Sequence, residues 1–63
     1  MSTTKELYIN IKKFWDDFEE NHHKFTEKGN KAAGGRARKA IGEVKKLVTE
    51  YRKVSVSEAK GNV

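Results

Sequence analysis

The 63-residue sequence contains no cysteine and no proline. Without cysteine, disulfides and thiolate metal sites are excluded, which is consistent with a reducing compartment. Without proline, nothing in the sequence forbids long helices. A chain of this length forms one domain at most, and its core is so small that such chains usually gain stability from a disulfide, a metal or a partner chain. We therefore expect a second chain to supply the missing stability.

Long hydrophobic runs are also missing. Uninterrupted apolar stretches are two or three residues long, which is too short to span a bilayer. The N-terminal residues lack the apolar core of a secretory signal. We therefore expect a cytosolic protein with no membrane partner.

Charge is abundant but unevenly distributed. Charged residues make up 37% of the chain, and the formal net charge is +5. Residues 1–27 hold four Lys against six acids, whereas residues 28–63 hold ten Lys or Arg against three Glu. A basic half beside a slightly acidic half indicates a polyanionic partner, first nucleic acid and second an acidic membrane surface. The alternative is that these charges only keep two helices soluble.

Apolar spacing predicts two helices within a single domain, residues 1–63. Thr3 and Glu6 have the spacing of a capping box, so the first helix should run from about residue 4 to 28. Its stripe alternates intervals of four and three residues: Leu7, Ile11, Phe14, Phe18, Asn21 and Phe25. The second helix should run from about 31 to 54, before a frayed tail at 55–63. Its stripe has the same spacing: Ala33, Ala37, Ala40, Val44, Leu47, Tyr51 and Val54.

The bend between the helices is predicted at residues 29–30. Gly29 has no Cβ and can adopt the left-handed conformation that ends a helix. Asn30 is a favoured N-cap for the next helix. Folding the chain back there sets large side chains against small ones towards the bend, Phe18 with Ala40 and Phe25 with Ala33. Towards the open end it sets residues of medium size against each other, as in Leu7 with Tyr51. We therefore predict an all-α, antiparallel two-helix hairpin.

We call the line along which the two apolar stripes meet the seam. In a single hairpin, some apolar residues beside the seam remain partly exposed. They are Tyr8, Trp15, Ile41 and Val48. Burying them against a second hairpin would give a four-helix bundle with a two-fold axis. We therefore expect a homodimer with these four residues at its interface.

Basic pairs recur every seven residues on the outer side of the second helix, and we expect no acid to enter this row. They are Arg38-Lys39, Lys45-Lys46 and Arg52-Lys53, and Lys31 begins the same row one heptad earlier. Each heptad rises about 10.5 Å, so the pairs extend over about 20 Å. Lys and Arg suit phosphate because they supply charge and donors. With the basic residues around the bend, the predicted DNA-binding residues are Lys28, Lys31, Arg36, Arg38, Lys39, Lys45, Lys46, Arg52 and Lys53.

Other groups of polar residues give only weak indications of a metal or catalytic site. His22 and His23 are adjacent and point about 100° apart on a helix, so they do not form the i, i+4 pair that a metal prefers. We place His22 at the seam and His23 in solvent. No catalytic residues, metal or cofactor are predicted, because a hairpin offers no cleft in which to desolvate its carboxylates. The sequence also shows no pattern of a base-reading motif, which predicts binding to phosphates irrespective of base sequence.

Three short motifs resemble the bacterial histone H1-like proteins. They are Lys28-Gly29-Asn30-Lys31-Ala32-Ala33, Arg36-x-Arg38 and Tyr51-Arg52-Lys53, and the likeness covers about residues 24–60. That family includes the chlamydial DNA-condensing protein and short relatives from Bacteroidetes. The resemblance implies binding and compaction of DNA in the bacterial nucleoid, with the helical region helping self-association.

We therefore expect a non-enzymatic, nucleoid-associated protein of the bacterial cytoplasm. Its role would be sequence-independent binding of double-stranded DNA and chromosome condensation. The alternative function is that of a protein–protein adaptor, in which the hairpin pairs with a larger acidic partner.

Overall fold

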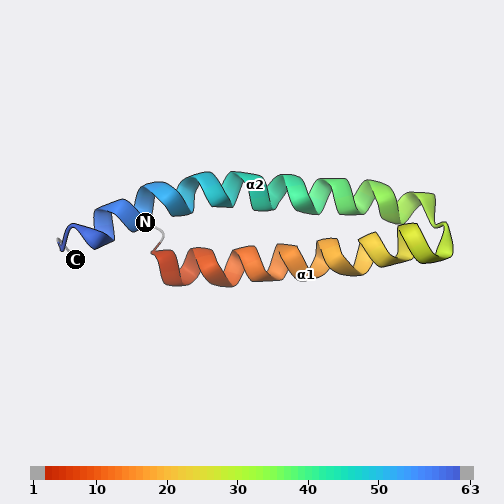
Figure 1. Ribbon diagram of the computed structural model, residues 1–63, viewed down its shortest axis with the longest axis horizontal. Coiled ribbons are helices and arrows are strands. Elements are labelled where there is room, and N and C mark those ends of the chain that lie inside the picture. The colour runs from red at the N-terminus through yellow and green to blue at the C-terminus, as the bar shows by residue number, and fades with distance from the viewer. Residues whose placement is uncertain (1–2, 62–63) are drawn as a thin grey trace.

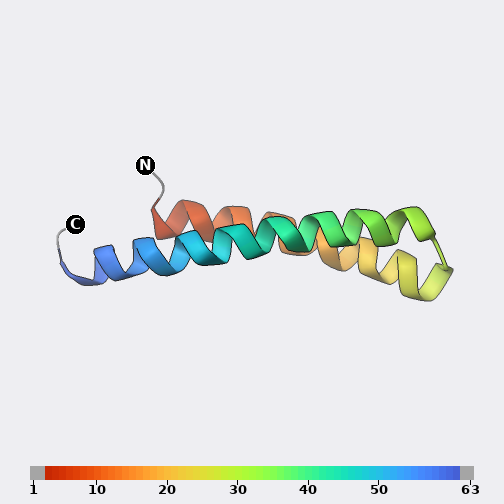
Figure 2. The ribbon, with the colours of Figure 1, turned by 90° about the horizontal axis from the view of Figure 1, so that it is seen from above.

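The computed structural model describes residues 3–61 and contains two α-helices, α1 (Thr4–Lys28) and α2 (Lys31–Ala59). The helices run antiparallel and lie side by side, and α2 extends past the start of α1 (Figure 1). Seen from above, α1 passes behind α2 and the two helices cross at a shallow angle (Figure 2). They contact each other directly. The molecule measures 48 × 15 × 14 Å. The predicted all-α hairpin is confirmed.

The start of α1 is held by the predicted capping box. The Glu6 N–H donates to the Thr3 hydroxyl at 3.2 Å, and the Thr3 N–H donates to Glu6 Oε1 at 3.0 Å. These two bonds satisfy amide groups that a helix start otherwise leaves without a partner. The first helix therefore begins where the sequence predicted.

The bend uses the two residues predicted for it. Gly29 lies at φ 66° and ψ 23°, in the left-handed region, and its N–H donates to the Lys24 carbonyl. The Asn30 side chain then accepts from the Ala33 N–H at 3.2 Å, which caps the start of α2. A helix stop and a helix start thus occupy adjacent positions, and the chain reverses within two residues.

The seam beside the bend is built from very small residues of α2. Ala33, Gly34, Ala37 and Ala40 are all buried there. The Phe25 ring of α1 lies directly against Gly34, since a Cβ placed on that glycine would meet ring atoms at 2.7 to 3.2 Å. The predicted partner of Phe25 was Ala33, one residue away. The large-against-small arrangement near the bend is therefore present, but with Gly34 in place of Ala33. The Phe25 ring is 43% exposed, so its predicted burial in the seam was wrong and it covers Gly34 from the edge.

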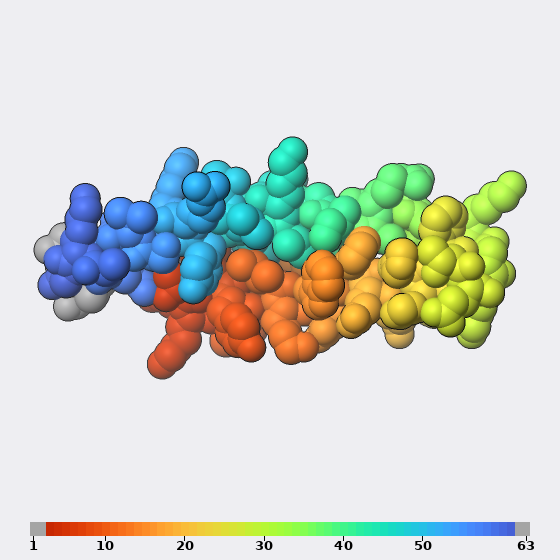
Figure 3. Space-filling model, viewed as in Figure 1, coloured from red at the N-terminus to blue at the C-terminus, as the bar shows by residue number. Residues whose placement is uncertain are grey.

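Away from the bend the seam is built from larger side chains. Leu7 is 1% exposed, but most of the other stripe residues are only half-buried, and Tyr51 remains 39% exposed. Figure 3 shows the two helices as one narrow body with side chains projecting along its length. The small core matches the expectation for a chain of this size.

The predicted end of the second helix, near residue 54, was wrong. Instead of fraying, α2 continues to Ala59, and residues 62–63 of the expected tail lie outside the described part of the chain. A contact between the two ends of the hairpin explains the extension. The Glu58 carboxylate accepts from the Thr4 N–H at 2.9 Å and also from the Thr4 hydroxyl. This carboxylate adds a favourable negative charge at the N-terminus of α1.

Two glycines of α2 predict opposite responses to alanine. A Cβ added to Gly42 would have no neighbour within 4 Å, so Gly42→Ala should stabilise the hairpin by up to about 1 kcal/mol through helix propensity alone. Gly34→Ala should lower the melting temperature, because the Phe25 ring must move away. Thermal melts followed by circular dichroism compare the two variants. An equal gain in both would show that Phe25 does not restrict the Gly34 position.

The contact of Glu58 with Thr4 predicts a pH-dependent contribution to stability. Hydrogen bonds from the Thr4 hydroxyl and then from its backbone N–H lower the pKa of Glu58 below its ordinary value of 4.5. Its stabilising effect should therefore be complete above that value and be lost as the pH falls through the lowered pKa. Glu58→Gln should melt earlier than the wild type at neutral pH, and the difference should disappear once the pH lies below the lowered pKa. A difference that persists in acid would contradict this role of the carboxylate.

Candidate nucleic-acid interface

All nine predicted DNA-binding residues are exposed. Lys28 is the last residue of α1, Lys31 is the first of α2, and the other seven lie along α2. The structure therefore brings them together on one helix and the adjoining bend. Their exposure leaves the charged ends accessible to a large ligand.

Most of this charge has no acidic partner within residues 3–61. The ion pairs there join Lys12 to Asp16 at 3.0 Å, His23 to Glu27 at 2.7 Å, and Lys46 to Glu43 at 3.4 Å. Of the nine predicted residues, only Lys46 takes part in one of them. Glu43 therefore reaches one residue of the basic row, Lys46. The remaining positive charge of α2 is not offset by an ion pair within residues 3–61.

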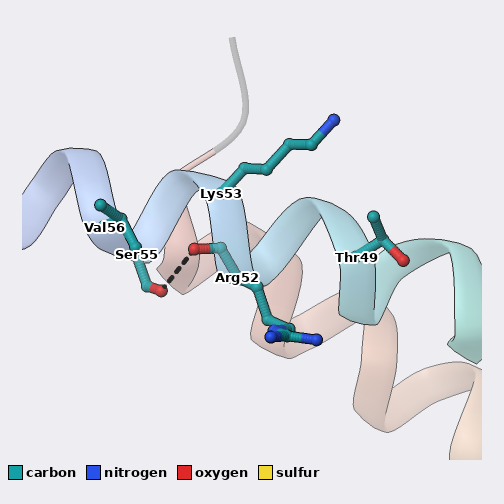
Figure 4. Close-up of a pocket in the computed structure, with 5 residues that line it drawn as sticks. All are labelled: Thr49, Arg52, Lys53, Ser55 and Val56. Atoms are coloured by element: carbon teal, nitrogen blue, oxygen red, sulfur yellow. Dashed lines mark hydrogen bonds between the residues drawn. The ribbon is translucent and has the colours of Figure 1, made fainter.

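Adjacent basic residues point in different directions from α2. Near the open end, Arg52 and Lys53 leave opposite sides of the helix (Figure 4). They line a shallow concavity together with Thr49, Ser55 and Val56, where the Ser55 hydroxyl donates to the Arg52 carbonyl at 3.0 Å. Because successive residues of an α-helix are about 100° apart, each basic pair covers a wide part of its circumference. The basic surface is therefore broad, and it is more than a single row.

Arg36 differs from the other basic residues because it is bonded across the seam. Its Nε donates to Asn21 Oδ1 at 2.8 Å. Asn21 is 3% exposed, and its amide nitrogen donates to the Asp17 carbonyl at 2.9 Å and to Asp17 Oδ1 at 3.1 Å. Every polar atom of this buried side chain therefore has a partner, as burial of an amide requires. Arg36 thus also supports the hairpin.

The outer face of α1 has a different chemistry. Lys12 donates to the Asp16 carboxylate, and this hydrogen bond, with the negative charge of Asp16, raises the pKa of Lys12. The exposed rings of Trp15 and His22 both pack on Phe18, at the edge of this face, with centroids 5.2 and 5.7 Å from the Phe18 ring. His22 is exposed, so its predicted place at the seam was wrong. It lies beside the seam residue Phe18 and stacks on its ring.

Three of the four residues predicted for a dimer interface are exposed in the single chain. Tyr8 is 61% exposed, Val48 44% and Trp15 43%, while Ile41 is half-buried. Exposure in a single chain does not test the homodimer, which stays a prediction.

Neither of the two described helices is long and apolar enough to cross a membrane. Residues 3–61 contain no group of three or more His, Asp or Glu side chains arranged to hold a metal ion.

Two long-range contacts were not predicted from the sequence: Arg36 with Asn21, and Glu58 with Thr4. Only the first could have been inferred from a sequence pattern. Asn21 falls at a seam position of the apolar stripe, and a polar residue at such a place needs a partner from the facing helix. The contact of Glu58 with Thr4 had no comparable signal, because both residues have ordinary polar identities near the chain ends. Each contact joins α1 to α2, and together they fix the two helices at separate points along the seam.

The fold and the distribution of charge define a small, basic, all-α hairpin with an exposed cationic helix. The chain belongs to the family of histone H1-like proteins described as Hc1, whose family model matches residues 5–61. No curated protein and no solved structure matches the chain significantly. Membership supports a DNA-condensing role in the nucleoid at the level of the family, which packages DNA and is not enzymatic.

Proposed function

We propose that this chain binds double-stranded DNA in the bacterial cytoplasm by contacting phosphates, without regard to base sequence. The observation that carries the proposal is the exposed positive charge of α2, most of which has no ion pair within residues 3–61. A strong field of one sign attracts a polyanion and releases the counterions condensed on it. The family supports DNA as that polyanion. It does not favour the alternative of a protein–protein adaptor.

The arrangement of the basic residues suits contacts to phosphates. They are long, exposed side chains spread around α2, and two of them, Arg52 and Lys53, line the shallow concavity near the open end. Lys and Arg are common donors to phosphate oxygens, which are the same at every base pair. The contacts therefore determine position on the backbone and supply no base readout.

A homodimer is part of the proposal. Tyr8, Trp15 and Val48 expose apolar surface on a hairpin whose core is small. Burial of apolar surface contributes about 25 cal/mol per Å², so a second hairpin would add the stability that a chain of this length needs. Two copies would also double the number of basic helices that one DNA molecule can meet.

Reversal of charge on α2 tests the phosphate contacts. If one chain neutralises about five phosphates, the logarithm of affinity should fall with the logarithm of salt concentration at a slope of about −4 to −5. The double variant Lys45→Glu and Arg52→Glu should reduce the steepness by about 1.8, equally for unrelated duplexes. Fluorescence anisotropy at several salt concentrations measures both quantities.

The matched control reverses two exposed lysines of α1, with Lys5→Glu and Lys13→Glu. This variant has the same net charge as the α2 variant and should keep a slope closer to that of the wild type. Equal slopes in the two variants would mean that only net charge matters and that α2 is not the binding surface. Strong preference for one duplex over another would mean that bases are being read.

The homodimer predicts a mass in solution. Sedimentation equilibrium at micromolar concentration should give twice the chain mass of 7.2 kDa. Trp15→Asp should return the mass to that of one chain and lower the melting temperature, because a charge would be buried at the interface. Ile9→Asp is the matched control, since Ile9 is equally apolar and 61% exposed but lies outside the predicted interface. A wild-type monomer that melts cooperatively would contradict the dimer.

A further inference from the structure

A concavity of about 330 Å³ lies between the two helices, halfway along the hairpin. It is lined by residues of both helices: Phe14 and Asp17 from α1, and Arg36, Lys39, Ala40 and Glu43 from α2. Two cations and two acids surround it, so these four charges sum to zero. The neighbouring Lys46 changes this balance through its ion pair with Glu43.

Both acids of the concavity already have partners. Asp17 Oδ1 accepts from the Asn21 amide at 3.1 Å, and Glu43 Oε2 lies 3.4 Å from the Lys46 ammonium. Arg36 and Lys39 form no ion pair within residues 3–61. The Lys46 ammonium offsets the charge of Glu43, whereas Asp17 keeps its charge because an amide is neutral. With Lys46 counted, three cations face two acids, and Arg36 and Lys39 are both exposed.

The position of the Arg36 guanidinium is fixed from the opposite helix. Its Nε donates to Asn21 Oδ1 at 2.8 Å, and the buried Asn21 is itself held by the Asp17 carbonyl at 2.9 Å. A guanidinium carries five N–H donors, so four remain on its two terminal amino groups. These four form a planar fork that matches two oxygens of a phosphate. A flexible surface arginine loses conformational entropy when it binds, and a fixed one loses less.

We propose that this concavity is a phosphate site, in which Arg36 and Lys39 bind one phosphate of the DNA backbone and Asn21 is the residue that positions Arg36. The inference rests on the proposed function and adds a defined site to it. Because Asn21 belongs to α1 and Arg36 to α2, the site is complete only in the closed hairpin. Phosphate binding there is therefore coupled to the pairing of the two helices.

Two substitutions separate the charge of Arg36 from its position. Arg36→Gln removes the charge, while the glutamine amide nitrogen occupies the place of arginine Nε along the side chain and can still donate to Asn21. Asn21→Leu removes the acceptor and keeps an apolar side chain of similar size at a buried position. Circular dichroism confirms folding, and anisotropy with one duplex at several salt concentrations measures affinity.

Arg36→Gln should reduce the steepness of the salt dependence by about 0.9 and weaken binding about eightfold at 0.1 M salt, as expected for the loss of one phosphate contact. Asn21→Leu should also weaken binding, and the double variant should bind no more weakly than Arg36→Gln alone. This non-additivity is the mark of a residue that acts through another. Arg38→Gln is the matched control, since its effect should add to that of Asn21→Leu.

Wild-type affinity of Asn21→Leu beside a weakened Arg36→Gln would overturn the role of Asn21. An unchanged salt slope in Arg36→Gln would overturn the site itself, whereas the charge reversal at Lys45 and Arg52 would still report on the proposed function. If Asn21→Leu does not fold, Arg36→Lys replaces it, because lysine keeps the charge but lacks the planar fork. Arg36→Lys should bind more weakly than the wild type, and wild-type affinity would equally overturn the proposal.

Discussion

The Phe25 ring of α1 lies directly against Gly34 of α2, so the two helices approach closely beside the bend. This contact requires a glycine on α2, and the buried alanines around it, Ala33, Ala37 and Ala40, continue the close approach. Because these small residues take up the inner side of α2, its long basic side chains lie on the outside. The packing of the seam and the exposure of the positive charge are therefore two consequences of one arrangement of residues.

Local signals in the sequence were sufficient to predict the hairpin. Thr3 with Glu6, Gly29 and Asn30 each determine a helix end through bonds to residues a few positions away, so α1 and the bend were predicted correctly. The end of α2 was not, because it depends on Glu58 reaching Thr4 at the other end of the chain. No spacing rule describes such a contact.

The same limit applies to the candidate site. Helical periodicity was sufficient to predict that the nine basic residues are exposed. It could not predict which side chains they would bond. The bond from Arg36 to Asn21 and the ion pair of Lys46 with Glu43 depend on side-chain conformations and on the pairing of two helices. In α1, by contrast, the ion pairs join residues of the same helix, Asp16 with Lys12 and Glu27 with His23. Within residues 3–61, no ion pair joins an acid of α1 to a basic residue of α2.

The central claim is that the basic face of α2 is the surface that meets DNA. The most direct measurement is a nuclear magnetic resonance titration of the isotopically labelled protein with a duplex of arbitrary sequence. Shifts of backbone and side-chain signals should concentrate at α2 positions such as Arg38, Lys45 and Arg52, and should change little when a second, unrelated duplex is used. Shifts centred instead on the outer face of α1, around Asp16 and Glu20, would contradict the account.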